Sequence, residues 1–145
     1  MKQILLVFFL AALLFPEHPE HPEHPTTKKE PQLTVEELAI SIENYIQNDI
    51  NLKGGFFVYD KNNKEILDLT LMKIHKERLS NIGGETYFAC ADFNASNGKI
   101  YDLDIFMKGK SQDNLDLTEI NVHKENGIAR YLWENQKGIW VKVNK

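Results

Sequence analysis

The chain has 145 residues, 42% of them hydrophobic and 26% charged, a length and composition that suit one globular domain. It carries 17 Lys and Arg against 21 Asp and Glu, which gives a net charge of −4. This mildly acidic balance argues against nucleic acid or an anionic membrane as a partner. The only cysteine, Cys90, excludes an intramolecular disulfide, a CxxC redox motif, a c-type haem site and a zinc site built from cysteines.

Residues 1–15 are predicted to be a signal peptide. One lysine precedes an unbroken apolar run at 4–15, which is shorter than the roughly 20 residues that a membrane-spanning helix needs. The alternatives are a buried N-terminal helix and an uncleaved anchor. We expect membrane contact only if the segment stays uncleaved. A signal peptide here predicts a periplasmic or secreted protein.

Residues 16–31 are predicted to be a disordered tether. They begin with three Pro-Glu-His repeats and contain all five prolines of the chain. The segment offers too little apolar surface to offset the entropy of ordering, and its proline spacing favours polyproline II. The folded domain is therefore expected at 32–145.

The tether histidines, His18, His21 and His24, are candidate metal ligands. On a polyproline II rod they stand about 9 Å apart, whereas two ligands of one zinc ion are about 3–4 Å apart. The repeat is then a stiff spacer that titrates near pH ~6.5, or it binds zinc or copper weakly. Weak binding would require a bend, a second chain, or separate sites with the neighbouring Glu17, Glu20 and Glu23. We expect no other cofactor.

The domain begins with a predicted helix at 34–52. Thr34 and Glu37 have the spacing of a capping box, and Leu33 and Leu38 that of a hydrophobic staple. Apolar residues then recur at a helical period until Gly54 and Gly55. The helix should bury one apolar face.

The rest of the chain predicts five to seven antiparallel strands, because short polar or glycine-containing turns separate runs with strand character. The expected strands are 56–60, 67–71, 86–93, 99–107, 115–123, 128–133 and 139–143. Residues 115–123 change the parity of their apolar positions, which predicts a β-bulge near Thr118 and Glu119. One helix wrapped by a bent antiparallel sheet is an α+β fold of cystatin-like shape, and shape alone does not determine function.

The strands at 86–93 and 99–107 predict which face the helix covers. If a five-residue turn joins them, Phe93 pairs with Lys99. The more apolar face, which includes Ala89 and Ala91, should then meet the helix, because small residues allow close approach. The opposite face is expected to be open.

This open face is the best candidate for a partner or ligand surface. Its candidate residues are Phe88, Cys90, Asp92, Asp102, Asp104 and Phe106. Aspartate is unfavourable in strands, so its recurrence there is informative. Aromatic and acidic side chains together suit a protein partner, whereas Asp102 and Asp104 could also bind a cation or perform acid–base catalysis.

The two histidines of the domain, His75 and His123, each lie in a His-Lys-Glu string. They are either surface residues or, if their strands are neighbours, ligands of a shared metal ion. Cys90 is either a half-buried apolar residue or a reactive thiol.

Three segments, at 75–79, 87–93 and 101–109, resemble small exported bacterial proteins of uncharacterised function that also carry a His/Pro/Glu-rich stretch after the signal peptide. The resemblance covers roughly residues 16–143 and implies location and general shape, but no activity. We therefore expect an exported, non-enzymatic binding domain whose partner is an envelope protein or a second copy. The alternative is a hydrolase-like or metal-dependent enzyme that uses Asp102 and Asp104 in a sheet-lined cleft.

Overall fold

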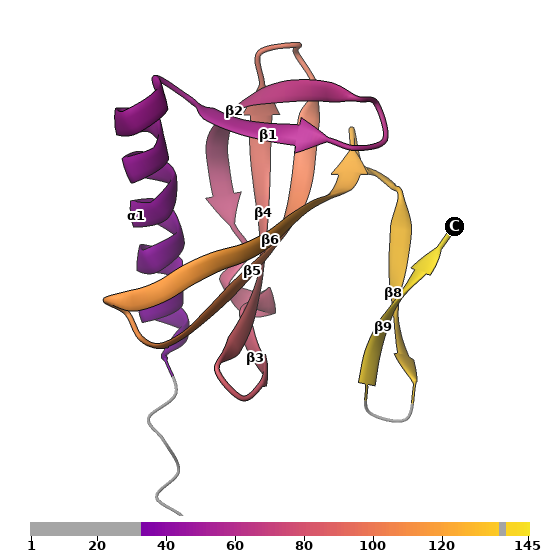
Figure 1. Ribbon diagram of the computed structural model, residues 1–145. Coiled ribbons are helices and arrows are strands. Elements are labelled where there is room, and N and C mark those ends of the chain that lie inside the picture. The colour runs from indigo at the N-terminus through magenta and orange to yellow at the C-terminus, as the bar shows by residue number, and fades with distance from the viewer. Residues whose placement is uncertain (1–32, 137–138) are drawn as a thin grey trace, which may run out of the picture.

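The computed structural model describes residues 33–136 and 139–145, in which one helix packs against a curled antiparallel sheet (Figure 1). The α+β class expected from the sequence is confirmed. The predicted signal peptide and tether lie outside the described residues. Within the described ranges, no helix has both the length and the apolar character needed to cross a membrane.

Helix α1 (Val35–Lys53) begins and ends one residue later than the predicted 34–52. The Thr34 hydroxyl accepts a hydrogen bond from the Glu37 amide, and the Glu37 carboxylate accepts one from the Thr34 amide. Gly54 ends the helix in the left-handed region at φ +82°, where glycine is favoured. The apolar stripe is buried at Leu38, Ala39, Ile42 and Ile46.

The main sheet has seven strands, in the order β1-β2-β4-β5-β6-β7, with β3 also paired to β4. A 3₁₀ turn, η1 (Lys76–Arg78), separates β2 from β3. The strands are β1 (Phe56–Asp60), β2 (Glu65–Ile74), β3 (Ser80–Gly83), β4 (Thr86–Ala95), β5 (Ile100–Ser111), β6 (Asn114–Glu125) and β7 (Ile128–Ala129).

The central pair, β4 and β5, divides the sheet into the two faces that the sequence predicts. We call the side with Ala89 and Ala91 the helix face, since its residues form the hydrophobic core with α1. The predicted register is wrong by two residues, because Ala95 pairs with Lys99 and makes the turn tighter than expected. Phe93 therefore lies opposite Tyr101. A shift of two residues preserves the side-chain parity, so the helix covers the face that was expected.

A second, two-stranded sheet lies on the other side. It is the hairpin of β8 (Tyr131–Gln136) and β9 (Ile139–Asn144). A single strand was predicted over 128–133, but the chain breaks at Arg130 and β8 leaves the main sheet. Figure 1 shows α1 and this hairpin on opposite sides of the sheet. We call the side of β4 and β5 beneath the hairpin the hairpin face.

Candidate metal centre

Four side chains on the hairpin face bring potential metal ligands together. They are Cys90 of β4, Asp102 and Asp104 of β5, and His123 of β6, and one donor atom from each lies within 4.8 Å of all the others. Cys90 and Asp104 are direct cross-strand partners. Asp102 and Asp104 share a face because side chains alternate along a strand. Cys90 is 1% exposed, Asp102 is 6% exposed and Asp104 is fully buried.

Side-chain alternation along β6 turns His123 toward this group, since its neighbour Val122 packs against the core, and a β-bulge brings Lys124 to the same side. Asp102 pairs with Lys124 and Leu103 pairs with Val122, so His123 is the extra residue on β6. In a regular strand His123 and Lys124 would point to opposite faces, whereas a bulge re-aims one of them. The Nδ1 atom of His123 lies 3.6 Å from Asp104 Oδ1 and 4.0 Å from Asp102 Oδ1. The other bulge, predicted near Thr118 and Glu119, is confirmed by the register there.

The hairpin covers the group, so the prediction of an open face is wrong. Tyr131 Oη donates a hydrogen bond to Asp104 Oδ2 at 2.5 Å, and Trp133 Nε1 donates to the same oxygen at 2.8 Å. The Tyr131 ring also stacks on His123, with ring centroids 4.7 Å apart. The break at Arg130 is the physical reason, because it lets β8 fold back over the aspartates instead of extending the sheet.

Asp102 is held as an anion by two donors. Cys90 Sγ donates to its Oδ1 at 2.7 Å and Lys124 Nζ donates to its Oδ2 at 2.8 Å. Burial is the largest influence on the pKa of Asp102 and raises it, but these hydrogen bonds outweigh burial and the pKa is lowered. Burial, followed by the hydrogen bond to Asp102, raises the pKa of the Cys90 thiol. With the hairpin closed and no metal bound, Cys90 is therefore buried and protonated at neutral pH, which argues against the reactive thiol.

Among the described residues, two buried polar atoms at the centre of the group have no hydrogen-bond partner: Asp104 Oδ1 and His123 Nδ1. A buried polar atom without a partner costs about 1–3 kcal/mol. The two atoms face each other at 3.6 Å. A small rotation would make an Asp–His hydrogen bond, and a cation between them would satisfy both atoms without it.

The donor set could hold a zinc ion if the donor atoms move closer together. Zn²⁺ takes thiolate, imidazole and carboxylate ligands in a tetrahedron, with donor atoms about 3–4 Å apart. The largest separation, 4.8 Å, requires a contraction of about 1 Å. Three anionic ligands leave one negative charge on a Zn²⁺ complex, which Lys124 offsets beside Asp102. All four positions can be filled by protein, which is typical of a structural zinc site rather than a catalytic one.

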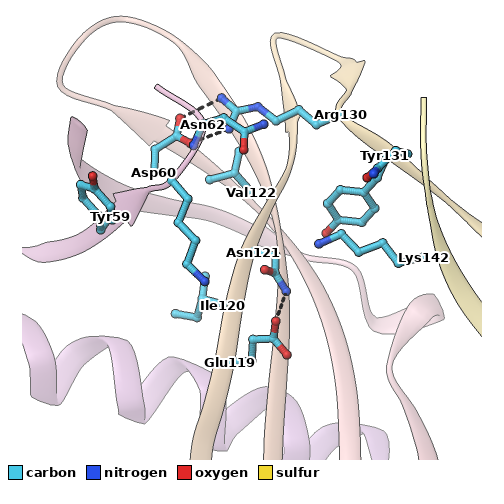
Figure 2. Close-up of a pocket in the computed structure, with 12 residues that line it drawn as sticks. Tyr59, Asp60, Asn62, Glu119, Ile120, Asn121, Val122, Arg130, Tyr131 and Lys142 are labelled. Atoms are coloured by element: carbon cyan, nitrogen blue, oxygen red, sulfur yellow. Dashed lines mark hydrogen bonds and ion pairs between the residues drawn. The ribbon is translucent and has the colours of Figure 1, made fainter. Parts of the chain in front are cut away.

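Tyr131 also lines a polar cavity of about 360 Å³ (Figure 2). None of the four grouped residues lines this cavity. On the cavity side, Lys142 Nζ lies 3.8 Å from the centre of the Tyr131 ring. The neighbouring Arg130 makes two hydrogen bonds to the buried carboxylate of Asp60, at 2.6 and 2.8 Å. Arg130 thereby fixes the start of β8, and with it the position of Tyr131.

The other predicted residues of the hairpin face surround the group. Phe88 and Phe106 are half-buried, with ring centroids 5.4 Å apart, and they pack against the Trp133 ring at 6.0 and 6.2 Å. Asp92 accepts a hydrogen bond from His75 Nε2 at 2.9 Å when that nitrogen is protonated. His75 is outside the four-residue group, so the two histidines do not share this site. His18, His21 and His24 lie outside the described residues.

No family model, curated protein or solved structure matches this chain.

Proposed function

We propose that this protein is a non-enzymatic binding domain whose ligand is a divalent transition-metal ion, with Zn²⁺ held by Cys90, Asp102, Asp104 and His123. The observation that carries this proposal is the pair of buried, unpartnered atoms Asp104 Oδ1 and His123 Nδ1 between two further donors. A metal ion satisfies both atoms at once.

The chemistry of the donors favours zinc over other ions. Mg²⁺ and Ca²⁺ prefer all-oxygen sites, whereas this group offers one sulfur and one nitrogen beside its carboxylates. Copper suits the imidazole and the thiolate, but two carboxylates match zinc better. Zinc is therefore the first expectation and copper the second.

Burial favours a closed site over an enzyme. A catalytic zinc keeps one open position for water or substrate, while Asp104 is fully buried beneath Tyr131 and Trp133. The alternative hydrolase-like function of Asp102 and Asp104 would require a cleft that reaches both carboxylates. Both instead accept hydrogen bonds from neighbouring side chains.

The cellular setting is part of the same proposal. An export signal at 1–15 would place the domain in the periplasm or outside the cell, and the segment at 16–31 would hold it away from the membrane with weak metal sites at His18, His21 and His24. One helix on a bent sheet is compatible with a cystatin-like arrangement, and kinship with small exported bacterial proteins stays part of the proposal. An envelope protein or a second copy remains the proposed partner.

Titration of the metal-free full chain with Co²⁺, followed by competition with Zn²⁺, tests the site. The triple variant His18→Gln/His21→Gln/His24→Gln removes the tether histidines and serves as the background. We expect one ion per chain and a thiolate-to-cobalt charge-transfer band, because Cys90 becomes a ligand. Cys90→Ser should abolish the band, and His123→Gln should lower the affinity by more than the roughly 10–100-fold typical of outer-shell changes.

The matched control is His75→Gln, the other histidine of the domain, which lies outside the group. It should bind Co²⁺ as the background does. Circular dichroism of each variant separates loss of a ligand from loss of the fold. A folded background chain that binds no Co²⁺, or one whose band survives Cys90→Ser, contradicts the proposal.

A further inference from the structure

The hairpin is attached to the rest of the domain mainly by side chains. Strands β8 and β9 pair with each other and share no ladder with the main sheet among the described residues. An isolated two-stranded hairpin is marginally stable in water. The attachment therefore depends on the ion pair of Arg130 at its base and on the contacts of Tyr131 and Trp133.

Asp104 belongs to both the hairpin contact and the candidate metal centre. Its Oδ2 accepts hydrogen bonds from Tyr131 and Trp133, and its Oδ1 faces the other donor atoms without a partner. Outer hydrogen bonds of this kind orient a carboxylate ligand and tune the metal site. Because one carboxylate serves both, the position of the hairpin and the affinity for metal are linked.

His123 provides a second link. Its ring stacks on Tyr131, while its Nδ1 faces Asp104 Oδ1. If the hairpin lifts, His123 loses the ring that orients it, and water reaches both unpartnered atoms. In the metal-free protein, opening therefore lets water hydrogen-bond to Asp104 Oδ1 and His123 Nδ1. In the metal-bound protein the ion already satisfies both atoms, so opening gains nothing there.

We infer that the β8–β9 hairpin is a metal-dependent cap and that Tyr131 and Trp133 are the positioning residues that couple it to the ion. This inference rests on the proposed function. Metal binding closes the hairpin over the hairpin face, and metal loss releases it. Because coupling is reciprocal, weakening the hairpin contacts must lower the affinity for metal.

Amide hydrogen exchange of the full chain, with and without Zn²⁺, tests the cap. Zn²⁺ should slow exchange across β8 and β9 by at least tenfold and leave the buried turns of α1 unchanged. Tyr131→Phe keeps the ring that stacks on His123, and Trp133→Phe keeps an aromatic ring near Phe88. Each should reduce Zn²⁺ affinity by about tenfold and speed hairpin exchange.

The matched control is Leu132→Ala, an exposed residue of the same strand that makes no hydrogen bond to Asp104. It should leave Zn²⁺ affinity unchanged. Zn²⁺ binding with a normal cobalt–thiolate band but no change in hairpin exchange would overturn the cap and leave the metal site intact. Absence of Zn²⁺ binding in a folded chain would overturn both. Unchanged affinity in Tyr131→Phe and Trp133→Phe would also overturn the coupling.

Discussion

The centres of the two faces of β4 and β5 are buried to a similar depth but by different chemistry. On the helix face, Ala91 and Leu103 are fully buried among apolar side chains of the core. On the hairpin face, Cys90 and Asp104 are buried as deeply but are polar, and their cover supplies hydrogen-bond donors instead of apolar surface. Depth of burial therefore does not distinguish a core from a site.

What distinguishes them is whether the buried groups satisfy one another. Apolar burial on the helix face stabilises the fold without any further partner. The hairpin face retains two unpartnered atoms at its centre, and such atoms call for an explanation in a native structure, such as an ion or a functional role. The helix face thus behaves as a core, and the hairpin face carries the group that we propose binds a metal ion.

The largest expected loss of stability comes from a substitution on the helix face. Leu103→Ala should lower the free energy of unfolding by about 4 kcal/mol, because it leaves a cavity in the core. Urea denaturation measures the loss. The loss should be the same with and without Zn²⁺, since Leu103 points away from the hairpin face. A loss that depends on Zn²⁺ would mean that the two faces are not independent.

The corner at which the hairpin begins should show the next effect. Asp60 is 1% exposed and paired with Arg130. Asp60→Asn should cost about 3 kcal/mol, the low end for breaking a buried ion pair, because Glu125 still contacts Arg130. Urea denaturation at neutral pH provides the measurement, with Asp68→Asn, an exposed acid of the neighbouring strand, as the control.

The same pair predicts a pH dependence. The Arg130 guanidinium lowers the pKa of Asp60. A carboxylate with a lowered folded-state pKa contributes stability that is complete above its unfolded value of about 3.9 and is lost as the pH falls through the folded value. Wild type should therefore lose more stability than Asp60→Asn between neutral pH and pH values below about 4. Parallel acid profiles would contradict the assignment.

Zn²⁺ should stabilise the folded protein only through residues of the hairpin face. Zn²⁺ at 100 times its dissociation constant should raise the free energy of unfolding by about 2.7 kcal/mol. Leu103→Ala should gain the same increment, and Asp104→Asn should gain much less. Asp92→Asn, a neighbouring acid on the same face but outside the group, is the control. An equal gain in Asp104→Asn would place the ion elsewhere.

Much of the fold follows from local sequence chemistry. The capping box at Thr34, the stop at Gly54 and the bulge near Thr118 are all encoded within a few residues, and each is confirmed. The division of β4 and β5 into two faces also survives the error in register, because an error of two residues keeps the parity.

The candidate site could be predicted only in part. Cys90, Asp102 and Asp104 stand out because polar residues are unusual within strands, so the face was identified but its exposure was not. The break at Arg130 depends on Asp60, 70 positions away, and a pattern in the local sequence does not reveal such a partner. His123 lies on the side of β6 away from Val122, so alternation could have placed it on the hairpin face. The bulge that adds Lys124 to that face leaves no signal in the apolar pattern.

The smallest expected effect concerns the tether. His18→Gln/His21→Gln/His24→Gln should leave the free energy of unfolding unchanged, because no core is predicted there. Calorimetric titration of the full chain with Zn²⁺ should then show one tight event in both proteins and additional weak heat in wild type only. The weak heat is expected because histidines about 9 Å apart on a polyproline II rod cannot share one ion. If the triple variant loses the tight event instead, the ligands are in the tether, and the unpartnered atoms beneath the hairpin are an Asp–His pair separated by a small rotation.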